Sequence, residues 1–179
     1  MSTRLNALIV ERIQETGPLT TAAFMELALY HPTLGYYTRA PRRTGRAGDF
    51  YTSVDVGPQF GGLLATQLDE MWRELASPAF DLVEVAAGNG QLCRDVLDAA
   101  ASRYPALYEA LRVHLVETSP TAREAHAEML GPHDARVETS GPELPLDVTG
   151  VILANELLDA LPTHAVTMTE HGLAEVFVA

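Results

Sequence analysis

The sequence predicts an α/β fold, in which a mostly parallel sheet follows a helical N-terminal extension. From Pro58 onward, short apolar runs alternate with stretches of helical periodicity, which is typical of successive βαβ units. The run at residues 151–154 (VILA) is apolar throughout, as expected of a strand buried on both faces of a parallel sheet. The 179 residues, 47% of them hydrophobic, suffice for one domain with a sizeable core.

Residues 1–57 are expected to form two helices and a lid-like loop. Apolar side chains recur at helical spacing over residues 5–13, and Gly17-Pro18 ends this first helix. A second helix is expected at residues 21–29, with one of two adjacent threonines as its cap. Residues 30–53 hold too many Gly and Pro residues for a regular element, but their five aromatic residues predict an ordered loop.

Residues 58–179 are expected to form the core of the fold. Its clearest helix spans residues 60–75, where apolar residues recur at i, i+3, i+4 and i+7. A capping Ser119 and a first-turn Pro120 begin another helix. The remaining predicted elements are helices at residues 91–101 and 156–161 and strands at residues 80–86, 112–117, 136–138, 150–155, 165–169 and 173–178.

The composition excludes several classes of protein. A formal net charge of −12 argues against nucleic-acid binding, which needs a basic surface, and the absence of lysine excludes a Schiff-base or P-loop lysine. The single cysteine, Cys93, excludes an intramolecular disulfide, favours a reducing, cytoplasmic location and is expected to be a packed core residue. No signal peptide or membrane-spanning stretch is expected, and the six histidines lack metal-ligand spacing.

The main candidate for a binding site is the turn at residues 83–90 (VEVAAGNG), between the first core strand and its helix. Its two glycines allow positive φ and close approach of a ligand to the backbone, at the edge where open α/β sheets bind ligands. A dinucleotide fingerprint would need Gly or Ala at position 93, where this chain has Cys93. A pyrophosphate fits poorly beside Glu84, whose carboxylate suits a positively charged ligand such as an ammonium or a sulfonium.

Polar side chains follow two further strands at the same expected edge. Glu117, 27 residues after Gly90, can accept hydrogen bonds from both ribose hydroxyls of an adenosine; the alternative is a solvated glutamate near a helix start. Asn155, Glu156 and Asp159 follow the fourth strand and are candidates for the same crevice. Alternatively, Asn155 caps a helix and the two acids are surface residues.

Five segments, in this order along the chain, resemble the MidA-type (NDUFAF7-like) family of class I S-adenosyl-L-methionine-dependent methyltransferases. They are FMELALYHPTLGYY, GDFYTS, VEVAAGNG, HLVETSP and ILANELLDALP, and the resemblance extends over about residues 20–168. It implies a Rossmann-like sheet with S-adenosyl-L-methionine as the cofactor. The implied cofactor-binding residues are Glu84, Ala86, Gly88, Asn89, Gly90, Glu117, Thr118 and Asn155. A loop containing Gly48, Phe50, Thr52 and Ser53 is implied to close over cofactor and substrate.

The resemblance also implies methyl transfer to an arginine of a partner protein, as in mitochondrial members that act on a respiratory complex I subunit during assembly. A guanidinium is protonated at physiological pH, so carboxylates must orient it and stabilise its charge. Asp49, Glu156 and Asp159 are the candidates for this catalytic role.

Two departures from the family pattern keep alternatives open. The glycine turn begins with Ala86 where the family has glycine, and the chain is shorter than family members, so the last strands of the family sheet are expected to be missing. A catalytically silent binding or assembly module is therefore one alternative, and a nicotinamide-dependent oxidoreductase is another. An exposed sheet edge near residues 173–178 predicts a homodimer.

Overall fold

The computed structural model describes residues 3–39 and 57–179, which belong to two compact units. One unit comprises residues 1–40 together with 158–179, and the other comprises residues 41–157. These units do not coincide with the division expected at residue 57, because the C-terminal segment joins the N-terminal helices. No helix within the described ranges is long and apolar enough to cross a membrane.

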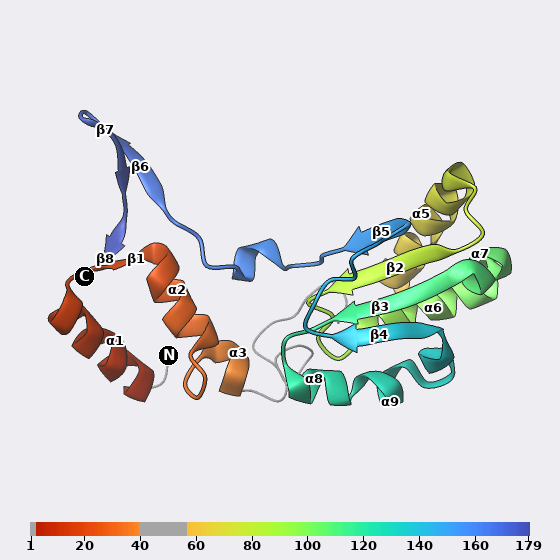
Figure 1. Cartoon of the computed structure of the whole chain (residues 1–179), viewed down its shortest axis with the longest axis horizontal. Helices are drawn as coiled ribbons and strands as arrows, with labels where there is room; N and C mark the ends of the chain where they lie inside the picture. Colours follow the sequence, from red (N-terminus) through yellow and green to blue (C-terminus); the bar gives the residue numbers. More distant parts are fainter. Residues whose placement is uncertain (1–2, 40–56) are drawn as a thin grey trace. The chain divides into compact units, whose positions relative to one another are not determined.

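The larger unit contains a four-stranded sheet in the order β4-β3-β2-β5, in which every neighbouring pair is parallel. Its strands are β2 (Phe80–Val85), β3 (Leu111–Val116), β4 (Val137–Gly141) and β5 (Gly150–Leu153). The four arrows point the same way in Figure 1, so their carboxyl ends meet at one edge. The predicted α/β fold is confirmed, and the first four predicted core strands are present with small shifts in their bounds.

Helices connect these strands. They are α5 (Gln59–Leu75), α6 (Gln91–Arg103), α7 (Pro105–Ala110), α8 (Pro120–Glu124), α9 (His126–Leu130) and the 3-10 helix η1 (Gly131–Arg136). Ser119 caps α8 as predicted, since its hydroxyl accepts from the Ala122 N–H at 3.4 Å. The core of this unit is formed by β2 and β3 with α6; Phe80, Val113 and Leu97 are fully buried there.

Helix α5 is present, and part of the predicted apolar stripe packs as expected, because Leu68 is buried and Phe60, Leu64 and Trp72 pack against the core. Leu63 and Leu75 belong to that stripe, yet they are 70% and 52% exposed. The buried residues of α5 are Gly61, Gly62, Ala65, Leu68 and Asp69. Small residues therefore add to the contact made by the large apolar ones, and a pattern of large apolar side chains does not reveal them.

The close contact between α5 and α6 depends on Gly61. A Cβ added there would lie 2.5 Å from the Cβ of Asp95, a separation that packed atoms do not tolerate. The neighbouring Gly62 is less constrained, because its added Cβ would lie 3.2 Å from the guanidinium end of Arg103.

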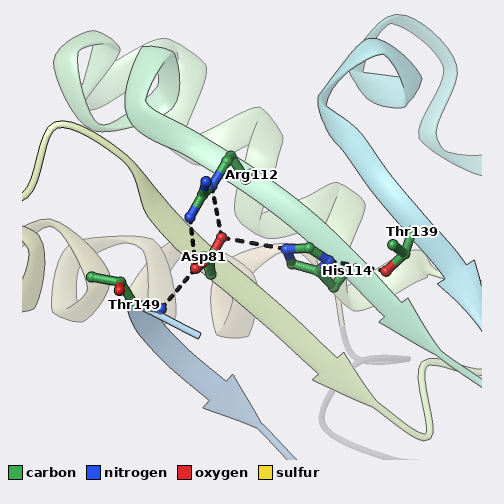
Figure 2. Close-up of polar contacts among 5 residues, drawn as sticks. All are labelled: Asp81, Arg112, His114, Thr139 and Thr149. Atoms are coloured by element: carbon green, nitrogen blue, oxygen red, sulfur yellow. Dashed lines mark hydrogen bonds and ion pairs between the residues drawn. The ribbon is translucent and has the colours of Figure 1, made fainter. Parts of the chain in front are cut away.

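The amino-terminal edge of the sheet is tied together by the buried carboxylate of Asp81 (Figure 2). Arg112 donates to it twice, at 2.8 and 2.9 Å, and the Thr149 N–H donates at 2.7 Å. The Nε2 of His114 lies 3.3 Å away, and its Nδ1 contacts the Thr139 hydroxyl at 2.9 Å. Burial by itself raises the pKa of Asp81, but these hydrogen bonds outweigh it and hold the pKa below its ordinary value.

The smaller unit packs two N-terminal helices with the C-terminal strands. It contains α1 (Thr3–Thr16), β1 (Leu19–Thr20), α2 (Thr21–Tyr30), α3 (Tyr36–Arg39), η2 (Leu158–Ala160), β6 (Val166–Thr169), β7 (Gly172–Glu175) and β8 (Phe177–Val178). Leu5, Ile9 and Leu19 form its buried core, and the Thr20 hydroxyl caps α2 by accepting from the Ala23 N–H. Both predicted N-terminal helices are confirmed.

The last predicted elements differ from the structure. Strands β6 and β7 form a separate antiparallel hairpin, and β8 pairs with β1, so none of them extends the parallel sheet. The helix predicted at residues 156–161 is reduced to the single turn η2. The predicted loop contains the one-turn helix α3, and residues 40–56 lie outside the described part of the chain.

Candidate functional site

The turn between β2 and α6 has three residues with positive φ. Gly88 and Gly90 have φ of +56° and +84°, and Ala86 has φ of +58°. The turn is closed by the Gly90 N–H, which donates to the Ala87 carbonyl at 2.8 Å. A Cβ added at Gly88 would meet no atom of the described residues within 4 Å, so among these residues nothing blocks the approach of a ligand to this side of the turn. The left-handed conformation disfavours the methyl group of Ala86 by about 1–2 kcal/mol.

Glu117 follows β3 and binds the glycine turn directly. Its Oε2 accepts from the Gly88 N–H at 2.9 Å, and its Oε1 accepts from the Ser119 N–H at 2.8 Å. An ionised carboxylate has about four acceptor positions, so each oxygen can still accept a hydrogen bond from a ligand. The Glu117 side chain is thus fixed beside the turn, and the alternative of a freely solvated glutamate is wrong. Thr118, next to it, is exposed.

Glu84 lies on β2 beneath the turn and is 5% exposed. Burial raises its pKa to about 8; the Cys93 N–H, which donates to the carboxyl group, opposes this shift, and the negative charge of Glu117 adds to it. Its Oε2 has no hydrogen-bond partner among the described residues. Such a buried orphan oxygen is costly, and a donor or a positive charge supplied by a ligand would relieve it.

Asn89 and Cys93 have local roles at the start of α6. The Asn89 side-chain oxygen accepts from the Gln91 N–H at 3.1 Å, which satisfies one free N–H of the first helical turn. Cys93 is 1% exposed, and burial raises the pKa of its thiol. The expectation that Cys93 is a packed residue is confirmed.

His126 is a residue of this site that the sequence analysis missed. It lies on α9, is 3% exposed, and its Nε2 donates to the Gly88 carbonyl at 2.9 Å. Its Nδ1 contacts the Ser140 hydroxyl at 2.9 Å. Metal-ligand spacing does not reveal this residue, because its partners are a backbone carbonyl and a serine.

The polar residues after β5 lie partly as expected. Because β5 is parallel to β2 with Leu153 opposite Glu84, Asn155 follows at the same edge as the turn and is half-buried. Asn155 does not cap a helix, since the next helical turn begins at Leu158. Glu156 is exposed and has φ of +52°.

The other predicted residues belong to the smaller unit or lie outside the described part of the chain. Asp159 belongs to the smaller unit, whose residues resume at Leu158. The residues assigned to the loop, namely Gly48, Asp49, Phe50, Thr52 and Ser53, lie outside the described residues. The described site therefore consists of the turn, Glu84, Glu117, His126 and the residues directly after β5.

The two carboxyl groups beside the turn favour positively charged ligands over anionic ones. Two carboxyl groups, Glu84 and Glu117, lie beside backbone N–H groups that would otherwise attract an anion. A pyrophosphate would meet negative charge there, whereas a ligand that carries both a positive charge and hydroxyl groups would be matched.

Known proteins resemble this chain along most of its length. A zebrafish (Danio rerio) protein named Protein arginine methyltransferase NDUFAF7, mitochondrial, is 34% identical over 95% of this chain and 45% of its own length. The human protein of that name is 31% identical over 95% of this chain and 44% of its own. The chain thus spans less than half the length of these curated relatives.

A solved structure also matches this chain over nearly its whole length. A protein from Burkholderia thailandensis, described as a likely methyl transferase, was solved with S-adenosyl-homocysteine bound. It superposes on this chain with a TM-score of 0.79 and 28% identity, over 97% of this chain and 46% of its own. A family model described as "Putative S-adenosyl-L-methionine-dependent methyltransferase" matches residues 63–179. Together with the parallel sheet and the glycine turn, this match confirms the resemblance noted in the sequence: the chain belongs to this methyltransferase family.

Proposed function

We propose that this chain binds S-adenosyl-L-methionine at the turn between β2 and α6 and takes part in methyl transfer to an arginine of a partner protein. The observation that carries the proposal is the Glu117 carboxylate, which accepts from the Gly88 N–H while remaining able to bind hydroxyl groups. The solved relative, bound to S-adenosyl-homocysteine, and the relatives named protein arginine methyltransferases support it.

The residues of the site fit this cofactor. Glu117 would bind the ribose hydroxyls, and the open side of Gly88 would admit the ligand close to the backbone. Glu84, with its unpartnered oxygen, would face the positively charged part. Ala86, Asn89, Gly90, Thr118 and Asn155 complete the proposed binding set. When bound, the cofactor supplies a methyl group already activated for transfer by the positive charge on sulfur.

Carboxylates are the groups that an arginine acceptor requires. The guanidinium stays protonated in water, so it must be oriented and stabilised until a proton leaves. Glu156, exposed at the carboxyl edge of the sheet, is the described candidate. Asp49 and Asp159 remain proposed catalytic residues, and Gly48, Phe50, Thr52 and Ser53 a proposed loop over cofactor and substrate.

Calorimetry with S-adenosyl-homocysteine tests the binding step. Glu117→Gln should weaken binding about 10- to 100-fold, because the amide keeps one acceptor oxygen, replaces the other with a donor and removes the charge. Glu128→Gln, a matched change at an exposed acid on α9, should leave the affinity unchanged. Failure of the unaltered chain to bind would refute the proposal.

Methyl transfer requires a second assay. Cell extract incubated with the chain and isotopically labelled S-adenosyl-L-methionine should yield labelled methylarginine after acid hydrolysis of its proteins. The yield should fall to background with Glu117→Gln and persist with Glu128→Gln. Equal labelling by both variants would exclude a role for this site.

A catalytically silent binding module is the second candidate. It is favoured by Ala86, whose methyl group is held in a left-handed conformation. Cofactor binding without methylarginine formation would select it. The oxidoreductase alternative is not retained, since the family is that of methyltransferases.

The quaternary state and location remain proposals. We propose a homodimer through the edge near residues 173–178, where Leu173 on β7 and Phe177 on β8 are 69% and 51% exposed. Ultracentrifugation of the chain at high concentration tests this, and a monomer refutes it.

A cytoplasmic location is proposed from the single buried cysteine, although the named relatives are mitochondrial.

A further inference from the structure

His126 forms two hydrogen bonds at the glycine turn from a fully packed position. Its Nε2 lies 2.9 Å from the Gly88 carbonyl oxygen, and its Nδ1 lies 2.9 Å from the Ser140 hydroxyl on β4. A carbonyl oxygen can only accept, so the proton must be on Nε2. The hydroxyl of Ser140 can either donate or accept, so it is a suitable partner for Nδ1, and both nitrogens have a hydrogen-bond partner.

The same imidazole ring packs under the second glycine of the turn. A Cβ added at Gly90 would lie 3.6 Å from Cδ2 of His126. Gly88 is therefore held from both sides, because its N–H donates to Glu117 and its carbonyl accepts from His126. These two partners come from different elements, one directly after β3 and the other on α9.

A second buried histidine, His133, serves as a comparison, because it is also hydrogen-bonded through both nitrogens but lies away from the turn. His133 is 5% exposed, and its two nitrogens contact Tyr108 at 2.8 Å and Asp98 at 2.9 Å. It matches His126 in burial and in the number of its partners, but neither of those partners belongs to the turn.

We propose that His126 is a positioning residue for the cofactor. By holding the carbonyl of Gly88 it limits rotation of the backbone at this residue, so that the N–H on the other side of the residue remains directed at Glu117 and the turn keeps the shape that receives the ligand. This inference rests on the proposed function. His126 would act through the backbone of Gly88 and would not touch a reacting atom.

Calorimetry with S-adenosyl-homocysteine, combined with thermal unfolding, tests this role. His126→Leu removes the donor and should weaken binding about 10-fold, the effect of one lost hydrogen bond to an otherwise unpartnered carbonyl. His126→Gln, whose amide can donate in place of Nε2, should bind within about 3-fold of the unaltered chain. His133→Leu should lower the melting temperature as much as His126→Leu while leaving the affinity unchanged.

Each result decides the question. Unchanged affinity in a folded His126→Leu protein, or equal weakening by His133→Leu, would overturn the role of His126 while leaving the proposed function intact. Absence of binding by the unaltered chain would overturn the proposed function and this role with it. If His126→Leu does not fold, His126→Asn replaces it. The amide of asparagine is too short to reach the Gly88 carbonyl, so the His126→Asn protein should bind S-adenosyl-homocysteine more weakly than the His126→Gln protein. Equal affinities of these two variants would overturn the inference.

Discussion

The buried carboxyl group of Glu84 predicts that the protein becomes less stable as pH rises. Its pKa is about 8 in the folded chain, compared with an ordinary value of 4.5 that applies when the chain unfolds. Between these two values the folded state holds a proton that the unfolded state releases. Unfolding is then favoured by increasing pH, so this contribution to stability is fully present below about pH 4.5 and is lost as pH rises through about 8.

The magnitude follows from the two pKa values. Each pH unit between them corresponds to about 1.4 kcal/mol, so the whole range corresponds to on the order of 5 kcal/mol. Between pH 5.5 and pH 8.5, the free energy of unfolding should fall by about 3 kcal/mol on account of Glu84 alone. This is a large fraction of the stability of a typical domain.

Urea unfolding of the unaltered chain and of Glu84→Gln at these two pH values measures the effect. The amide does not titrate, so the variant should lack the 3 kcal/mol fall, whatever its stability at a single pH. Glu128→Gln, at an exposed acid, should retain the full pH dependence. The same pH dependence in Glu84→Gln and the unaltered chain would refute the reasoning, because the proton would then be bound elsewhere.

Further predictions concern the same turn and the packing of α5. Ala86→Gly should raise the free energy of unfolding by about 1 kcal/mol and tighten S-adenosyl-homocysteine binding, while Ala76→Gly, at φ of +48° outside the site, should stabilise similarly without changing affinity. Gly61→Ala should destabilise by about 1–3 kcal/mol in urea unfolding, whereas Gly62→Ala should be tolerated or gain up to about 1 kcal/mol; equal losses would contradict the packing argument. In calorimetry, S-adenosyl-L-methionine should bind more tightly as pH rises towards 8, and Glu84→Gln should abolish this trend.

The sequence predicts the two central strands of the parallel sheet well because β2 and β3 are buried almost throughout. The expectation that residues 151–154 form a strand buried on both faces is wrong, because β5 is an edge strand of the described sheet and Ile152 is 54% exposed. The short, mostly apolar segments of β2, β3 and β5 are separated by glycines and by stretches of helical periodicity, which is the pattern that predicts strands. Prediction fails for the C-terminal strands, since alternation alone does not reveal pairing partners. Strand β8 joins β1, a two-residue strand near the other end of the chain, and no local pattern marks such a long-range pair.

The candidate site divides in the same way. The turn and Glu117 are predictable because each follows directly from its strand, and parallel strands bring their carboxyl ends together. The contribution of His126 cannot be predicted from the sequence, because it depends on how α9 packs against the turn. Asp159 differs from both: it is close in sequence to β5 but belongs to the smaller unit, so its catalytic role stays a prediction.

Two buried acids on β2 show how a structural carboxylate differs from one in a binding site. Asp81, 1% exposed at the amino edge, receives hydrogen bonds from Arg112, His114 and Thr149, and its pKa is lowered. Glu84, 5% exposed near the carboxyl edge, accepts from one backbone N–H, keeps an orphan oxygen and has a raised pKa. If both acids served only the fold, the second would be an uncompensated loss of about 1–3 kcal/mol. The incomplete partners of Glu84 occur at the edge where ligands bind in open sheets, so a donor or positive charge from the ligand is the simplest physical reason for its presence.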